Sequence, residues 1–176
     1  CGTSHNATDL INPKSALTGH TPIRKNTTHW FLPLDQHQEW LSEWILKSHT
    51  DWKPNVYGQC KSWLTDGLKP RAVTRDLNWG IPVPLKNAEG KVLYVWFDAP
   101  IGYIGTLEKF LKDSNNKATA KDLWSEDSKY EIYHFIGKDI LNFHALFWPA
   151  LLHAAEFKKP SNVFVHGFLT LNGNKM

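Results

Sequence analysis

The sequence predicts an α/β fold whose core is a parallel β-sheet flanked by helices. Three short runs rich in apolar residues, at residues 92–97, 131–136 and 163–166, are expected to be strands. The first run is continuously apolar, which is typical of a strand buried on both faces of a sheet. Segments with helical character separate the runs, and strands that alternate with helices indicate a parallel sheet with crossover connections. A length of 176 residues suits one domain, or one domain with part of another.

Composition excludes several classes of protein. The net charge is only +3 and both signs are interspersed, so no basic arm for nucleic acid is evident. No apolar stretch approaches the roughly 20 residues that span a bilayer, and the start at Cys1 lacks the pattern of a signal peptide. Two cysteines are too few for a disulfide framework. We therefore expect a cytoplasmic protein that does not span a membrane.

The first elements expected are an extended segment and two helices. Residues 30–34 are apolar and extended, and Asp35 is a plausible N-cap for a helix over 36–48. One face of that helix is apolar, comprising Trp40, Leu41, Trp44 and Ile45. Such a stripe is usually core rather than a binding surface. A second helix is expected over 57–65, ended by Gly67.

The remaining helices follow the predicted strands. Asp98 and Pro100 open a helix after the first strand, since proline is tolerated in a first helical turn. After the second strand, Gly137 turns the chain and Asp139 caps a helix that reaches about Ala155. The third strand then ends the regular pattern, and no internal repeat or low-complexity tract is present.

Polar residues gather where the predicted strands end. Asp98 follows the first strand, Gly137-Lys138-Asp139 the second and His166-Gly167 the third. In doubly wound sheets, ligands bind beyond the carboxyl ends of the strands. Gly137 would admit a nucleotide close to the backbone, and Asp139 could accept hydrogen bonds from ribose hydroxyls. From the tripeptide alone, a plain strand-to-helix turn is favoured over a nucleotide site by about two to one.

A second group of candidate binding residues is largely aromatic. Ile140, His144 and Trp148 share one helical face, and the neighbours Phe143 and Phe147 add flat walls. Trp96, Pro100 and Tyr103 project from the neighbouring strand end and helix start. A lone histidine on an apolar face is usually a satisfied core group. The same residues also describe a cleft for a medium-sized apolar side chain with one polar handle.

Three segments carry a resemblance to a known family. They are Tyr94-Val-Trp-Phe-Asp-Ala-Pro-Ile-Gly-Tyr103, the segment from His134-Phe-Ile-Gly-Lys-Asp to Trp148-Pro149, and Asn172-Gly-Asn-Lys-Met176. In this order and spacing the chain resembles the methionyl-tRNA synthetase family of class I. The resemblance implies an internal piece of such an enzyme. Residues 1–91 would be the latter part of a connective α+β insertion, and 92–176 the second half of a Rossmann-like catalytic domain that ends inside the ATP-handling loop.

The resemblance also implies roles for individual residues. The methionine side chain would contact Trp96, Pro100, Tyr103, Ile140, His144 and Trp148. The adenosine ribose would lie on Gly137 and Asp139, with His166 and Leu169 at the ATP site. Arg75 would lie near the reacting groups, and Lys175 would stabilise the departing pyrophosphate.

The implied reaction is that of a methionine–tRNA ligase, which forms methionyl-adenylate from methionine and ATP and then charges tRNA(Met). Attack of a carboxylate on the α-phosphate needs positioning and charge neutralisation by lysines, Mg²⁺ and backbone donors. A thioether suits aromatic walls because sulfur makes favourable contacts with rings.

Departures from the family pattern set further expectations. The His-x-Gly-His signature of the class is absent, so the chain alone is not expected to activate methionine. Cys1 resembles the last cysteine of a zinc knuckle, but one cysteine cannot provide the four ligands zinc requires, and no zinc is expected. Cys60 is expected to be a small buried hydrophobe.

Two alternatives remain at this point. One is a stand-alone binding or scaffold module that retains a half-site. The other is a class I synthetase for leucine, isoleucine or valine, against which the segment from Trp96 to Tyr103 argues.

Overall fold

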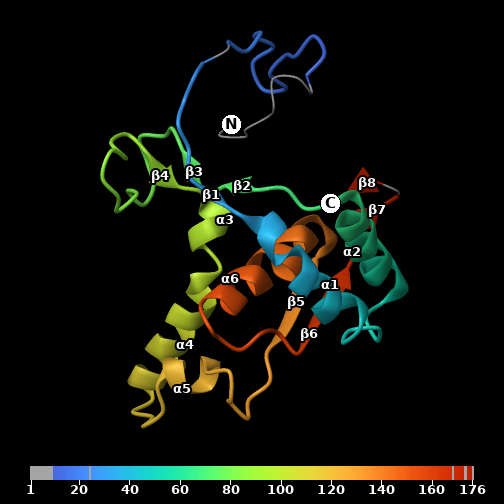
Figure 1. Cartoon of the computed structure of the whole chain (residues 1–176), viewed down its shortest axis with the longest axis vertical. Helices are drawn as coiled ribbons and strands as arrows, with labels where there is room; N and C mark the ends of the chain where they lie inside the picture. Colours follow the sequence, from blue (N-terminus) through green and yellow to red (C-terminus); the bar gives the residue numbers. More distant parts are fainter. Residues whose placement is uncertain (1–9, 24, 168, 173, 176) are drawn as a thin grey trace. The chain divides into compact units, whose positions relative to one another are not determined.

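In the computed structural model, the described residues are 10–23, 25–167, 169–172 and 174–175, with side chains described as far as residue 172. They form two compact units, drawn in Figure 1. The first comprises Cys1–Phe31 and Ala72–Val95, and the second comprises Leu32–Arg71 and Trp96–Met176. These units follow contacts in space, whereas the division between residues 91 and 92 follows a family's domain order and stays a prediction.

The first unit contains a small antiparallel sheet. Strand β3 (Thr74–Arg75) pairs with β4 (Val92–Leu93), with Thr74 opposite Leu93 and Arg75 opposite Val92. The predicted strand over 92–97 is therefore wrong beyond Leu93, because the chain continues into the short helix α3 (Val95–Asp98). An apolar run without periodicity does not by itself distinguish a strand from a helical segment. Asp98 consequently ends a helix instead of following a parallel strand.

The N-terminal half of the second unit is helical. A 3-10 turn, η2 (Leu34–His37), leads into α1 (Gln38–Leu46), and α2 spans Pro54–Asp66. Asp35 lies inside η2 and does not cap α1, because the chain already turns at Leu34. The predicted apolar stripe is confirmed as core at Leu41 and Ile45, which are fully buried and pack with α2. Cys60 is a buried free thiol, and burial raises its pKa to about 12. The prediction that Cys60 is a small buried hydrophobe is confirmed.

The C-terminal half of this unit carries a two-stranded parallel sheet. Strand β5 (Tyr133–Gly137) pairs with β6 (Asn162–His166) in a register that sets Gly137 opposite His166. The prediction of parallel strands is confirmed for this pair. It is wrong for a third strand from residues 92–97, since β4 pairs antiparallel elsewhere. One face of the pair packs into the core, and the other exposes Phe135 and Phe164.

Further helices precede and follow β5 in the chain. Helix α4 (Ile101–Asp113) precedes α5 (Ala120–Trp124), which begins with a reciprocal Thr119–Asp122 capping box. After β5 the chain forms a 3-10 turn, η3 (Lys138–Ile140), a π-helical turn, η4 (Phe143–Phe147), and α6 (Trp148–Ala154). Asp139 lies within η3 and makes no side-chain cap, which corrects the predicted capping role.

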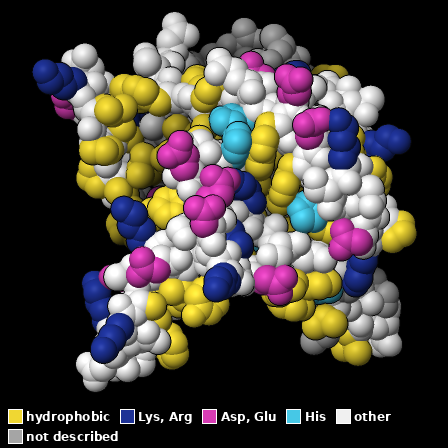
Figure 2. Space-filling view, turned by 60° about the horizontal axis from the view of Figure 1, so that its bottom comes forward, with side chains coloured by type: hydrophobic (Ala, Val, Ile, Leu, Met, Phe, Trp, Pro, Cys, Tyr) yellow, Lys and Arg dark blue, Asp and Glu magenta, His cyan; other side chains and the backbone are white. Residues whose placement is uncertain are grey.

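The remaining strands have two residues each: β1 (Phe31–Leu32), β2 (Arg71–Ala72), β7 (Thr170–Leu171) and β8 (Asn174–Lys175). Strands β7 and β8 pair antiparallel. Among the described residues, no helix has the length and apolar character needed to cross a membrane. On the face shown in Figure 2, basic and acidic side chains are interspersed, as the small net charge implies.

Candidate functional site

A cavity of about 280 Å³ lies beside the beginning of α4. Its lining residues are Trp96, Ala99, Pro100, Gly102, Tyr103, Thr106 and His144. Four of the six residues predicted to hold an apolar side chain thus share one cavity: Trp96, Pro100, Tyr103 and His144. They come from α3, the start of α4 and the π-helical turn η4, so segments more than 40 positions apart converge here.

Two hydrogen bonds orient the His144 ring. Its Nδ1 lies 3.0 Å from the carbonyl oxygen of Ile140, and its Nε2 lies 2.8 Å from the hydroxyl of Tyr103. A carbonyl can only accept, so Nδ1 carries the proton and donates. In the neutral ring Nε2 then accepts from the Tyr103 hydroxyl. Ile140 therefore contributes its backbone carbonyl and does not line the cavity.

The cavity is electrically neutral near neutral pH. His144 is 1% exposed, and burial lowers its pKa, partly opposed by its bond to Ile140. Burial also raises the pKa of the Tyr103 hydroxyl. Neither ring is therefore ionised at pH 7. A neutral, largely apolar cavity accepts an uncharged side chain without desolvating an ion.

Stacked rings support the cavity wall. Trp96 stacks on Phe143 with ring centres 4.4 Å apart and planes 12° from parallel. Trp148 is buried behind Tyr103, with ring centres 6.4 Å apart, and so supports the wall from outside the cavity. Sequence reasoning placed Trp148 in the lining, whereas the structure places it one layer deeper.

His134 is a residue that the sequence reasoning missed. It lies on β5, 6% exposed, with its ring 5.0 Å from that of Tyr103 and 5.3 Å from that of His144. Its Nε2 has no hydrogen-bond partner among the described residues. Burial, with a smaller contribution from His144, lowers its pKa to about 4. The available signal was its position two residues before Ile136, on the buried face of a strand.

The ends of β5 and β6 bring together the predicted nucleotide-binding residues. Gly137 lies opposite His166, and an added Cβ at Gly137 would lie 2.7 Å from Oδ1 of Asp139. A side chain at position 137 would therefore displace the carboxylate. The imidazole Nδ1 of His166 lies 2.9 Å from the carbonyl oxygen of Gly167, to which it donates. Leu169 is 74% exposed.

The predicted reaction residues are only partly described. Arg75 belongs to the first unit, where its guanidinium lies 3.8 Å from the centre of the Tyr94 ring and donates to the carbonyls of Ala72 and Thr74. Lys175 lies in β8, and its side chain is outside the described residues, as is Cys1. In the described part of the chain, no group of three or more His, Cys, Asp or Glu side chains could hold a metal ion.

Known proteins match this chain over its whole length. The family model described as tRNA synthetases class I (M) covers residues 1–176. The methionine–tRNA ligase of Bacteroides fragilis is 56% identical over 177 residues, covering 100% of this chain and 25% of that protein. That of Cytophaga hutchinsonii is 53% identical over 182 residues, covering 100% of this chain and 26% of that protein. The chain therefore spans about a quarter of the length of these relatives.

Solved structures agree with the sequence comparison. Mycobacterium tuberculosis methionyl-tRNA synthetase in complex with methionyl-adenylate matches with a TM-score of 0.68 at 28% identity, over 93% of this chain and 30% of that one. Its apo form matches with a TM-score of 0.64 at 27% identity, over 88% of this chain and 30% of that one.

Proposed function

The chain belongs to the class I methionyl-tRNA synthetase family, and on that premise we propose that it forms the methionine pocket and part of the ATP site of a methionine–tRNA ligase. The observation that carries the proposal is the neutral cavity built by Trp96, Pro100, Tyr103 and His144. Its ring walls suit a thioether, because sulfur packs favourably against aromatic rings. The buried His144 and its two hydrogen bonds hold the cavity in one shape.

The end of the β5–β6 pair supports the ATP side of the proposal. Gly137 leaves the backbone open beside the Asp139 carboxylate, which has the acceptor oxygens that ribose hydroxyls require. His166 is the register partner of Gly137, so it lies at the same strand ends. We assign the adenosine to these three residues, with Leu169 against the base.

The proposed reaction proceeds in two steps. A carboxylate oxygen of methionine bonds to the α-phosphorus of ATP, and the bond to pyrophosphate breaks, with its electron pair leaving on pyrophosphate. Methionine then passes from the adenylate to tRNA(Met), and AMP departs. Arg75 and Lys175 are the proposed cations near the reacting phosphates, and Mg²⁺ bound to ATP would neutralise further charge. The ligase is proposed to act in the cytoplasm, with any zinc held by a knuckle to which Cys1 belongs.

Methionine-dependent ATP–pyrophosphate exchange tests the proposal. A ligase that contains this chain should catalyse exchange with methionine and far less with leucine, isoleucine or valine. The 176-residue chain alone should not, since a phosphate-clamping lysine acts only when the rest of the site holds it. Exchange that prefers another aliphatic amino acid would refute the methionine assignment. Robust exchange by the chain alone would show that the catalytic residues are misplaced.

A further inference from the structure

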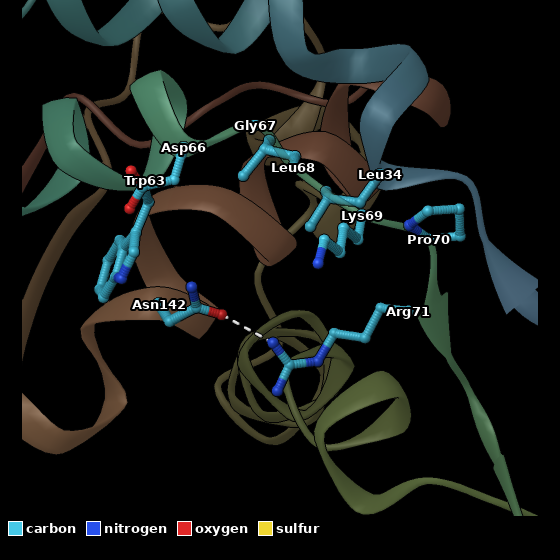
Figure 3. A pocket seen from close by; sticks show the side chains of 9 residues that line it. All are labelled: Leu34, Trp63, Asp66, Gly67, Leu68, Lys69, Pro70, Arg71 and Asn142. Carbon is cyan, nitrogen blue, oxygen red and sulfur yellow. Dashed lines mark hydrogen bonds between the residues drawn. The ribbon is translucent and has the colours of Figure 1, made fainter. Parts of the chain in front are cut away.

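A second cavity, of about 320 Å³, lies in the same unit and shares no lining residue with the first. Its walls are Leu34, Trp63, Asp66, Gly67, Leu68, Lys69, Pro70, Arg71 and Asn142. Figure 3 shows these side chains around a common space, between the end of α2, the segment that leads into β2, and Asn142. None of the residues assigned to methionine or ATP faces this space.

The Arg71 guanidinium is held in place at this cavity. Its Nη1 donates to Oδ1 of Asn142 at 2.8 Å, and its central carbon lies 4.7 Å from the Phe143 ring centre and 5.9 Å from that of Phe147. Aromatic faces stabilise a guanidinium without neutralising it. An amide oxygen does not neutralise it either. The ion pairs of the described residues do not include Arg71.

Lys69 adds a second cation. In Figure 3 its amino group points into the same space as the Arg71 guanidinium and the Asn142 amide. The one acidic lining residue, Asp66, lies at the opposite end, beside Trp63. The cavity therefore has a positive end, with two cations and an amide, and an end with a half-buried indole ring.

We propose that this cavity binds a phosphate group of RNA, with a neighbouring base against Trp63. A planar guanidinium held on aromatic rings matches the geometry of phosphate oxygens, and Lys69 supplies a mobile second charge. The Trp63 ring is half-buried and lines the cavity, and aromatic rings are the groups on which unpaired bases stack. The inference rests on the proposed function, which supplies tRNA(Met) as the RNA. A free nucleotide presents the same chemistry and is the rival source of the phosphate.

The test is the salt dependence of tRNA(Met) binding to a ligase that contains this chain. Each phosphate contact to single-stranded RNA contributes about 0.7 to the slope of log K against log salt. Lys69→Gln should lower the magnitude of the slope by about 0.7 and weaken binding about twofold to fivefold near 0.15 M salt, the range of exposed ion pairs. Lys61→Gln is the matched control, because Lys61 is exposed on α2 and outside the cavity. Its slope should equal that of the unmodified enzyme.

A second variant tests the guanidinium. Arg71→Lys keeps the charge but removes the planar fork, so it should weaken tRNA(Met) binding while preserving most of the salt slope. Equal slopes for the Lys69→Gln and Lys61→Gln enzymes would overturn the proposal. A Lys69-dependent affinity for AMP with an unchanged tRNA slope would also overturn the RNA source. Methionine-dependent pyrophosphate exchange requires no RNA, so its loss in the unmodified enzyme would instead refute the proposed function.

Discussion

Removing the Tyr103 hydroxyl tests the geometry of the proposed methionine pocket directly. Tyr103→Phe deletes the donor that lies 2.8 Å from Nε2 of His144, whose side chain is 1% exposed. A buried acceptor without a partner costs about 1–3 kcal/mol. Tyr103 itself is 43% exposed, so water can replace part of the lost bond. We therefore expect the free energy of unfolding to fall by about 1 kcal/mol, at the lower end of that range.

A double-mutant cycle with His144→Leu isolates the bond. In the His144→Leu background no buried acceptor is left without a partner, so Tyr103→Phe should hardly change the free energy of unfolding. The coupling energy between the two positions should therefore be about 1 kcal/mol. Urea unfolding of the 176-residue chain with an unchanged m value is the measurement. Tyr133→Phe is the control, because it removes an exposed hydroxyl bonded to Glu131 and should change stability by less than about 0.5 kcal/mol. An equal cost of Tyr103→Phe in both backgrounds would refute the assigned bond and tautomer.

Three further predictions concern the same unit. Trp96→Ala removes a ring stacked 4.4 Å from Phe143. It should lower kcat/KM for methionine in pyrophosphate exchange about 30-fold to 1000-fold, which corresponds to about 2–4 kcal/mol. An unchanged kcat/KM would contradict the pocket assignment. Gly137→Ala should displace the Asp139 carboxylate and raise KM for ATP but not for methionine, whereas Gly105→Ala, in open space inside α4, should stabilise the fold by about 0.5–1 kcal/mol. An unchanged or lowered KM for ATP would contradict the assignment of the adenosine to Gly137 and Asp139. Stability should also fall by about 3 kcal/mol as the pH drops from 6.5 to about 4, because the folded state depresses the pKa of His134 and protonation then favours the unfolded state. His134→Gln should flatten that part of the stability curve, and an identical curve would show that His134 does not titrate there.

The depressed histidine pKa values also bear on how the pocket works. His144 and His134 are both neutral at pH 7 because burial disfavours their charged forms. Protonation of either ring would place a charge beside an apolar cavity, which a thioether could not compensate. Methionine binding should therefore tolerate pH values down to the point at which the fold itself weakens.

The sequence pattern within a short segment was sufficient to predict some features of the fold. The 3.6-residue spacing of Leu41 and Ile45 predicts a buried helix face, because burial repeats with the helical turn. Gly67 ends α2 with a φ of +84°, a conformation that glycine adopts without strain. The parallel pairing of β5 and β6 also followed from the alternation of strands and helices.

Local pattern was insufficient where a segment's partner decides its structure. The apolar run that begins at Val92 reads as one strand, yet only Val92 and Leu93 have a strand partner, and the chain coils into α3 directly after them. Asp139 reads as a helix cap, but its carboxylate instead lies beside Gly137, where an added Cβ would approach to 2.7 Å. For the run at Val92, the deciding strand partner β3 lies almost 20 positions earlier, where the local pattern does not reach.

The sequence by itself determined the family, the parallel strand pair and the residue types that a neutral pocket requires. Their chemistry can be read from side-chain identity and spacing alone. Only the tertiary structure decided that Trp148 supports the pocket from behind, that His134 lies buried against Tyr103 and His144, and that Arg71 rests on the Phe143 ring. These relations join residues from 10 to about 70 positions apart. Burial and hydrogen-bond partners at such separations are set by packing, which short-range periodicity does not specify.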